Sequence, residues 1–242
     1  MFIRGPWRAW AILVLILAVQ VAQHRSTFAQ SPGTPAPSTP TPTPTPAAPE
    51  AATPALELKG ILDVTILDKG YGVNGAQGKA IHVVATADIP TLGVYGLGVA
   101  RNGNGTTGEA QIMFSSADSA RAGDNILLVR SIKAMNEYMD AETIFDKVTS
   151  VVRGATVVDW SKGHPINQNG NDAIELYFNG AVIETFGDVD VDGMGQDWEY
   201  KGAWAYKIDG AWTYGPVSCT AGSITTWDSS CVYPLAQEKA LE

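Results

Sequence analysis

The sequence predicts an all-β fold, a sandwich or a barrel of short strands, with one short inserted helix. From Leu56 onward, short apolar runs alternate with clusters of Gly, Asn and Asp, which is typical of strands joined by turns. Asn179-Gly180 lies between two such runs and is the strongest short signal for a β-hairpin. Glycine is abundant, at 25 of 242 residues, and the long amphipathic repeats of a helical bundle are missing.

The strands are expected at the short, regular spacing of an all-β domain. The second of them alternates, with Ile81, Val83 and Ala85 on one face and His82 and Val84 on the other. The strands expected from apolar runs between turn signals are 58–66, 79–86, 92–100, 112–114, 125–129, 173–178 and 181–186.

One stretch has helical spacing instead. Ser131 is suited to cap the start of this helix, because a serine side chain can accept a hydrogen bond from the first turn. The apolar residues that fit the helical spacing are Ile132, Met135, Met139, Phe145 and Val148.

Residues 1–29 have the pattern of a secretory signal peptide. Arg4 and Arg8 precede an apolar run over 9–22, which is short for a membrane span and suited to the apolar region of a signal peptide. Small residues before the expected cleavage site place the cut after Ala29.

The mature protein is therefore expected to begin near Gln30 and to lie outside the cell, on its surface, or in the periplasm of a Gram-negative host. An uncleaved membrane anchor is the alternative, because His24 and Arg25 separate the apolar run from the cleavage site. Contact with a membrane is expected only through such an anchor.

Residues 30–56 are expected to form a disordered Pro/Thr-rich linker before the folded domain, 57–242. Nine of the fourteen prolines lie in 31–54, mixed with Thr, Ala and Ser. Proline fixes φ and lacks a backbone donor, so this stretch favours polyproline II over a sheet or a helix. The linker is interpreted as a spacer, with an O-glycosylated stalk as the alternative.

The chain is acidic, with 16 basic and 25 acidic residues and a net charge of −9. Arg4, Arg8 and Arg25 belong to the predicted signal peptide, so the mature chain carries 13 basic and 25 acidic residues, a net charge of −12. Such a chain repels phosphate backbones, which excludes binding of nucleic acid by bulk charge.

The two cysteines, Cys219 and Cys231, have eleven residues between them. In an exported protein, an isolated pair this close predicts a disulfide. A metal or redox pair is the alternative, but the spacing is not CxxC and no histidine lies nearby.

Three segments carry longer motifs. The first is GKAIHVV at 78–84, followed by the apolar segment 89–98. The second is NQNGNDAIELYFNGAVIETFG at 167–187, and the third is WEY at 198–200 with WAY at 204–206.

These segments resemble the opening hairpin, a later hairpin and the closing segment of the bacterial lamin-tail-like domains. The resemblance spans about 57–100 and 167–214 and departs from the family pattern at His82, where an acidic residue is common, and at Lys207, where arginine is usual. It implies an immunoglobulin-like β-sandwich. It also implies an accessory or display module of secreted proteins, often beside nucleases or phosphatases, with no catalysis of its own.

Catalytic motifs are missing from the sequence. After removal of the signal peptide, His82 and His164 are the only histidines, and both are interpreted as structural. No GxSxG, HExxH or P-loop motif is present. The chain is therefore predicted not to be an enzyme. A hydrolase of nuclease, phosphatase or glycosidase type, with an unrecognised carboxylate site, stays open.

Aromatic residues crowd the last third of the chain. The period-two spacing of Tyr200, Trp204 and Tyr206 favours packing in the core over a carbohydrate platform. Trp212 and Trp227, near the cysteines, are the candidates for exposed, ligand-facing rings.

The segment 188–199, DVDVDGMGQDWE, matches the EF-hand calcium loop, with Asp at positions 1, 3 and 5, Gly at 6 and Glu at 12. Calcium requires six to eight oxygen ligands, which alternate residues of a tight loop can supply. An acidic, solvated loop is the alternative, because position 8 is glycine and a strand, not a helix, precedes the segment. The expected ligands are the side chains of Asp188, Asp190, Asp192 and Glu199 and the backbone carbonyl of Met194.

The sequence thus predicts an exported, non-catalytic binding or display module stabilised by calcium, whose partner is an extracellular polysaccharide or protein. A secreted hydrolase and a purely structural surface protein are the alternatives. Converging carboxylates in a cleft favour the hydrolase, and an exposed aromatic face favours the binding module.

Overall fold

The structure, a computed structural model, describes residues 53–65, 76–150, 156–157 and 166–242. These residues belong to one compact unit, Ala51–Glu242. The predicted signal peptide, most of the predicted linker and His164 lie outside the described residues. Among the described residues, no helix combines the length and the apolar character that a membrane span requires.

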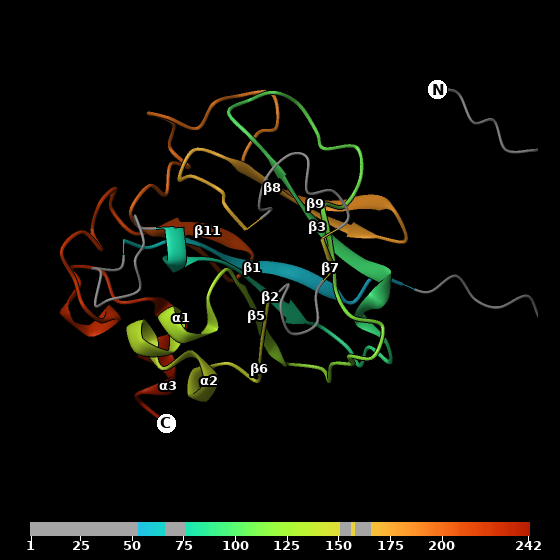
Figure 1. The fold of residues 1–242 in the computed structure, drawn as a ribbon, viewed down its shortest axis with the longest axis horizontal. Helices are drawn as coiled ribbons and strands as arrows, with labels where there is room; N and C mark the ends of the chain where they lie inside the picture. The colour runs from blue at the N-terminus through green and yellow to red at the C-terminus, as the bar shows by residue number, and fades with distance from the viewer. Residues whose placement is uncertain (1–52, 66–75, 151–155, 158–165) are drawn as a thin grey trace, which may run out of the picture. The chain divides into compact units, whose positions relative to one another are not determined.

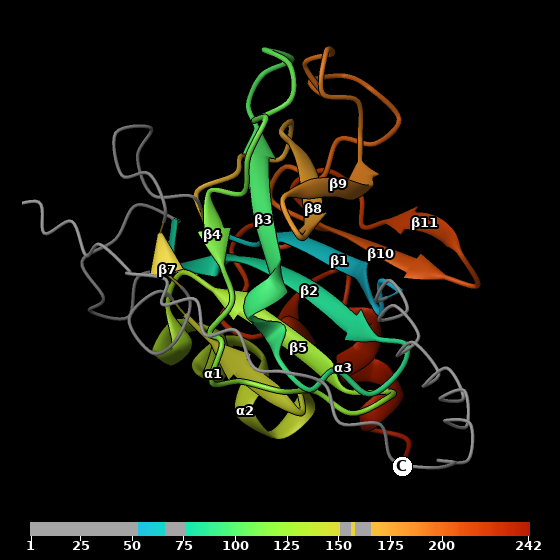
Figure 2. The ribbon, with the colours of Figure 1, turned by 90° about the vertical axis from the view of Figure 1, so that its right-hand side faces the viewer.

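Two β-sheets form the fold, and Figures 1 and 2 show their strands crossing in separate layers. The fold is mostly β with few helices, which confirms the predicted all-β class. The six-stranded sheet has the order β11 (Ala211–Tyr214), β10 (Trp204–Ile208), β1 (Leu56–Asp63), β2 (Lys79–Ala85), β5 (Asn125–Val129) and β6 (Lys147–Thr149). The five-stranded sheet has the order β7 (Thr156–Val157), β4 (Ile112–Met113), β3 (Tyr95–Ala100), β8 (Ala173–Phe178) and β9 (Ala181–Phe186).

The larger hydrophobic core takes side chains from both sheets. Ile81 and Val83 of β2 are fully buried in it, as the predicted alternation of this strand requires. Leu97 of β3 and Leu176 of β8 belong to the same cluster. Burial of one aliphatic side chain contributes about 1.5–3 kcal/mol, so this core holds the two sheets together.

A second core covers the other face of the six-stranded sheet. Leu127 and Val129 of β5 and Tyr206 of β10 are buried there together with the helices and the disulfide loop. The central strands are therefore apolar on both faces, and His82 of β2, which points to this side, is buried as well. The helices are α1 (Ile132–Met139), α2 (Ala141–Ile144) and α3 (Pro234–Lys239).

The prediction of a single helix was wrong. α1 begins after Ser131, whose side chain accepts a hydrogen bond from the Ala134 amide at 3.2 Å, as expected of the N-cap. Asp140 then takes a left-handed conformation with φ 54° and ends α1, so Phe145 and Val148 are not part of that helix. α3 was not predicted, because its six residues are too few to reveal a helical period.

The hairpin of β8 and β9 matches its predicted bounds. Asn179 and Gly180 join the strands with φ of 50° and 81°. Both values lie in the left-handed region that a two-residue type I′ turn requires, and Asn-Gly tolerates it best. Elsewhere the predicted boundaries shift, since the predicted strand 92–100 begins with the 3-10 turn η2 (Leu92–Val94).

Long loops gather at one end of the two sheets, at the top of Figure 2. The loop after β3 and the loop after β9 lie side by side there, and the Gly105 amide donates to the Val189 carbonyl at 2.9 Å. This end of the fold carries most of the polar residues that the sequence analysis singled out.

Candidate binding site at the loop end of the sheets

Three loops meet at this end: the loop after β3, the segment 167–172 before β8, and the segment 187–203 after β9. The Asn102 amide donates to Asp172 Oδ1 at 3.0 Å, which joins the first loop to the second. The Gly193 amide donates to the Asn171 carbonyl at 3.0 Å, which joins the third loop to the second. The loops therefore form one connected structure.

A cavity of about 330 Å³ opens between these loops. Six of its seven lining residues are polar or charged, with three amides, two carboxylates and one ammonium group. Met194, whose side chain is exposed, is the apolar member. The residues that line the cavity are Asp63, Asn102, Asn169, Asn171, Met194, Glu199 and Lys201.

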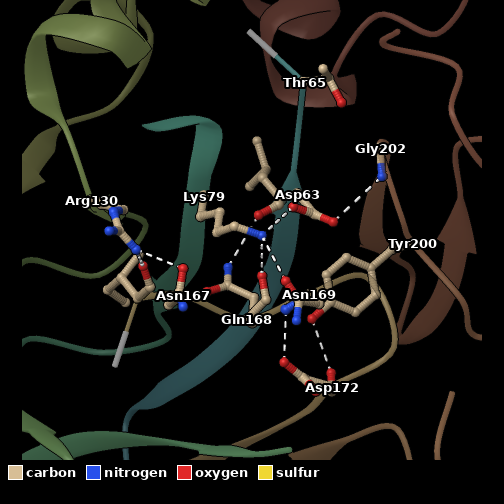
Figure 3. A network of polar contacts seen from close by, with 12 residues as sticks. Asp63, Thr65, Lys79, Arg130, Asn167, Gln168, Asn169, Asp172, Tyr200 and Gly202 are labelled. Carbon is tan, nitrogen blue, oxygen red and sulfur yellow. Dashed lines mark hydrogen bonds and ion pairs between the residues drawn. The ribbon is translucent and has the colours of Figure 1, made fainter. Parts of the chain in front are cut away.

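A buried ion pair lies beside the cavity (Figure 3). Lys79 Nζ donates to Asp63 Oδ1 at 2.6 Å, and only 8% and 12% of the two side chains are exposed. Lys79 also donates to the Gln168 carbonyl at 2.6 Å and to Asn169 Oδ1 at 3.4 Å. Burial raises the pKa of the Asp63 carboxyl, although the charge and hydrogen bond of Lys79 act in the opposite direction.

Asp172 and Tyr200 continue this polar network. Asp172 accepts hydrogen bonds from the amides of Asn102 and Asn169, at 3.0 and 2.7 Å, and Tyr200 donates its hydroxyl proton to the Asp172 carbonyl. Burial raises the pKa of Asp172, and it raises the pKa of the fully buried Tyr200 well above its usual value. Tyr200 therefore stays neutral and acts as a hydrogen-bond donor.

Gln168 fixes the segment before β8 to the six-stranded sheet. Its Nε2 donates to the carbonyls of Leu62 and Ala80, each at 3.1 Å, so the amide orientation is set by two acceptors. Its Oε1 is buried and has no hydrogen-bond partner among the described residues.

The predicted calcium ligands lie in an irregular loop that follows β9. Asp188 Oδ1 accepts a hydrogen bond from the Asp190 amide at 2.9 Å. Asp192 Oδ1 accepts from the Met194 amide at 2.9 Å and from Asn171 Nδ2 at 2.6 Å, and these bonds lower the pKa of Asp192.

Glu199, at position 12 of the loop, turns back toward position 8. Its Oε2 accepts from the Gly195 amide at 2.8 Å. Met194, which was expected to supply a backbone carbonyl, has a side chain that is 63% exposed. Local hydrogen bonds thus fix the backbone near each end of the loop.

The loop supplies ligand types that suit calcium, namely carboxylate and backbone oxygens. Within the described ranges, no group of three or more His, Cys, Asp or Glu side chains is arranged to hold a metal ion. Calcium also takes amide, backbone and water oxygens, so this observation does not decide the matter. The calcium set of Asp188, Asp190, Asp192, Met194 and Glu199 stays a prediction.

The two candidate aromatic residues differ in solvent exposure. Trp227 is 51% exposed. Trp212 is half-buried against the core, and its ring centre lies 4.7 Å from that of Phe186. Lys207 Nζ lies over the Trp212 ring, 5.1 Å from the ring centre. Trp212 is therefore part of the packing at the edge of the core, and Trp227 is the exposed ring.

The predicted disulfide is confirmed. Cys219 and Cys231 are bonded, with 5.7 Å between their Cα atoms, and both belong to the second core. Trp204 Nε1 donates to the Cys231 carbonyl at 3.1 Å, which attaches the disulfide loop to β10.

The sequence analysis missed the cavity and the buried pair beside it. Asp63, Lys79 and Asn169 come from three segments far apart in the chain, so no local spacing joins them. The polar run Asn167–Asp172, directly before the predicted strand 173–178, was the available signal, since turns often carry Asn and Asp to bind backbone groups.

Comparison of the chain with family models, with curated proteins and with solved structures found no match. The resemblance to lamin-tail-like domains therefore stays a prediction.

Proposed function

We propose that the chain is an exported, non-catalytic binding module with an immunoglobulin-like sandwich of the lamin-tail-like type, carried on its Pro/Thr-rich spacer. It binds an extracellular polysaccharide. The observation that carries this proposal is the exposed indole of Trp227 on a loop closed by a disulfide. The disulfide also supports export, since such bonds persist in oxidising compartments.

Trp227 is exposed but its backbone is fixed. It lies in the 3-10 turn η3 (Thr226–Asp228), which Thr225 and Asp228 close with a reciprocal capping box. Thr226 is buried, and its Oγ1 accepts a hydrogen bond from the Tyr233 amide at 3.0 Å. A ring held by a rigid backbone loses little freedom when a ligand binds, which favours affinity.

Further apolar side chains are exposed in and beside this loop. Ile224, within the loop, is 42% exposed, and Val217, two residues before Cys219, is 49% exposed. An exposed tryptophan with a polar N–H suits ligands that present both C–H groups and hydroxyls, as sugar rings do. A protein partner is the other class of ligand that such a surface serves.

Calcium is proposed to stabilise the loop 188–199. Asp188, Asp190, Asp192 and Glu199 would hold the ion, together with the carbonyl of Met194. A hard divalent cation would neutralise the repulsion between these carboxylates, and it would supply no chemistry of its own.

The test is binding of the mature chain to a glycan and polysaccharide array, compared with two variants. We expect saturable binding that Trp227→Ala abolishes. Val182→Ala is the matched control, because Val182 is 41% exposed on β9, and it should bind normally. No binding to any glycan, or equal binding by Trp227→Ala, contradicts the proposal.

A hydrolase is the second candidate, and one observation favours it: Asp63 and Glu199 line the same cavity. Carboxylates in different environments can act as acid and base. Against this role, the Asp63 carboxylate is already bonded to Lys79 at 2.6 Å. Release of reducing ends from a polysaccharide, lost in Glu199→Gln and in Asp63→Asn, would establish the hydrolase instead.

A further inference from the structure

We propose that the cavity at the loop end is a second binding site, distinct from Trp227, for a neutral ligand rich in hydroxyl groups, such as one sugar residue. This site goes beyond the proposed function, which rests on the disulfide loop. Four features of the cavity support it: fixed walls, balanced charge, unused amide groups and an apolar rim.

The walls of the cavity are preformed. A Cβ atom on Gly170 would lie 1.9 Å from the Lys201 Cα, so the two loops touch through their backbones. The Tyr200 amide donates to the Gly170 carbonyl at 2.8 Å at the same place. A ligand therefore enters a cavity that needs no ordering of the loops, which lowers the entropic cost of binding.

The charges that line the cavity balance. Asp63 is paired with Lys79, and Glu199 and Lys201 carry opposite charges. An anionic ligand would meet Glu199, and a cationic ligand would meet Lys201, so neither gains a net attraction. A neutral polar ligand avoids both conflicts.

The three asparagine side chains offer the cavity both hydrogen-bond donors and hydrogen-bond acceptors. Asn171 Nδ2 donates to Asn102 Oδ1 at 3.1 Å and to Asp192 Oδ1 at 2.6 Å. Asn169 Oδ1 accepts from Lys79. Among the described residues, these bonds leave the amide NH₂ groups of Asn102 and Asn169 as donors and the Asn171 side-chain oxygen as an acceptor.

A hydroxyl group both donates and accepts, so neighbouring hydroxyls of a sugar match this mixture of donors and acceptors. Met194, exposed at the rim, offers an apolar contact for the C–H groups of a ring.

The test is titration of the full mature chain, followed by NMR, with the methyl glycosides of glucose, galactose, mannose, xylose and N-acetylglucosamine. Glucuronate, glucosamine and inorganic phosphate are the charged probes. We expect saturable binding of at least one neutral glycoside and weaker binding of all three charged probes. No binding of any neutral glycoside, or tighter binding of a charged probe, overturns the proposal.

Variants locate the site. Asn169→Ala should weaken binding of the neutral glycoside about five- to tenfold, the loss of one hydrogen bond. Lys201→Met should weaken it by a similar factor, because it removes an ammonium donor from the wall of the cavity. Gln237→Ala removes an exposed amide on α3 and should leave the affinity unchanged. Trp227→Ala should also leave it unchanged, so this test fails or succeeds independently of the proposed function. Unaltered affinity in Asn169→Ala and Lys201→Met, with both variants folded by circular dichroism, overturns the site.

Discussion

The imidazole of His82 and the hydroxyl of Tyr233 lie 2.9 Å apart inside the second core, and both residues are fully buried. Asn125 completes the contact, because its Nδ2 donates to the Gly123 carbonyl and its Oδ1 faces His82 Nε2 at 3.0 Å. His82 therefore carries its proton on Nε2 and accepts at Nδ1 from Tyr233. This chain of bonds ties β2 and β5 to the C-terminal segment after the disulfide.

We predict that His82 makes the stability of the domain depend on pH. Burial lowers the pKa of His82 from 6.5 to about 3, and the charge of Lys59 acts in the same direction, while Asn125 and Asp146 oppose it. The unfolded chain gains a proton below pH 6.5 and the folded chain does not. Stability from this residue is therefore complete above pH 6.5 and falls by about 1.4 kcal/mol per unit between pH 6.5 and pH 3.

Urea unfolding between pH 7.5 and pH 4.5 measures this effect above the range where most carboxylates titrate. His82→Gln removes the titration and should flatten the slope of stability against pH. Tyr233→Phe keeps the buried imidazole and should keep the slope while lowering the overall stability. A wild-type slope that persists in His82→Gln contradicts the prediction.

We predict that Lys79→Met destabilises the domain by about 3–5 kcal/mol, because it leaves the buried Asp63 carboxylate without its partner. Lys239→Met is the control: Lys239 pairs with Glu242 at the surface, where solvent screens the two charges, so its loss should change the stability little. Urea unfolding at pH 7 gives both values. A loss below about 1 kcal/mol in Lys79→Met would mean that water or another group satisfies Asp63.

Local chemistry explains which elements the sequence could predict. Asn179-Gly180 demands one turn type, and Ser131 is suited to an N-cap, so the hairpin and the start of α1 follow from a few neighbouring residues. Asp140 has no such signal. Its left-handed conformation ends α1 because α2 and β6 must return to the sheet, which is a tertiary requirement.

Contacts between distant segments explain what the sequence could not predict. Asp63 and Lys79 are 16 residues apart, and Gln168 is 89 residues beyond Lys79. Only the pairing of β1 with β2, and the position of the loop before β8, bring these three together. The cavity beside them depends on the same contacts, so the polar run 167–172 was its one local signal and spacing could not show what it packs against.

We predict that loss of the disulfide costs about 3 kcal/mol, the value for closing a loop of this size in the unfolded chain. The double variant Cys219→Ala/Cys231→Ala should show this loss in urea unfolding. It should also reduce glycan binding through Trp227, whose loop the disulfide closes, while binding at the loop-end cavity persists. Reduction of the wild type should raise its intact mass by two hydrogens. Equal free energies of unfolding for the oxidised wild type and the double variant would contradict the prediction.

We predict that the loop 188–199 binds calcium with a dissociation constant of about 10⁻⁴ to 10⁻³ M, the range of extracellular modules. Five carboxylates within twelve residues, the four expected ligands and Asp197, repel one another without the ion. Binding to the folded state alone should raise the melting temperature by about 3–10 °C in roughly 10 mM calcium relative to chelator. Trp198, adjacent to Glu199 in the chain, provides a fluorescence signal for the same titration.

Two variants decide whether the predicted ligands carry this effect. Asp188→Ala removes the first ligand and Glu199→Gln removes the bidentate one, so each should abolish most of the calcium-dependent rise. Asp209→Asn is the matched control, because Asp209 is an exposed acidic residue in the turn between β10 and β11, and it should keep the full rise. A melting temperature that calcium does not change, or an equal rise in Asp188→Ala and Glu199→Gln, would show that the segment is a solvated acidic loop.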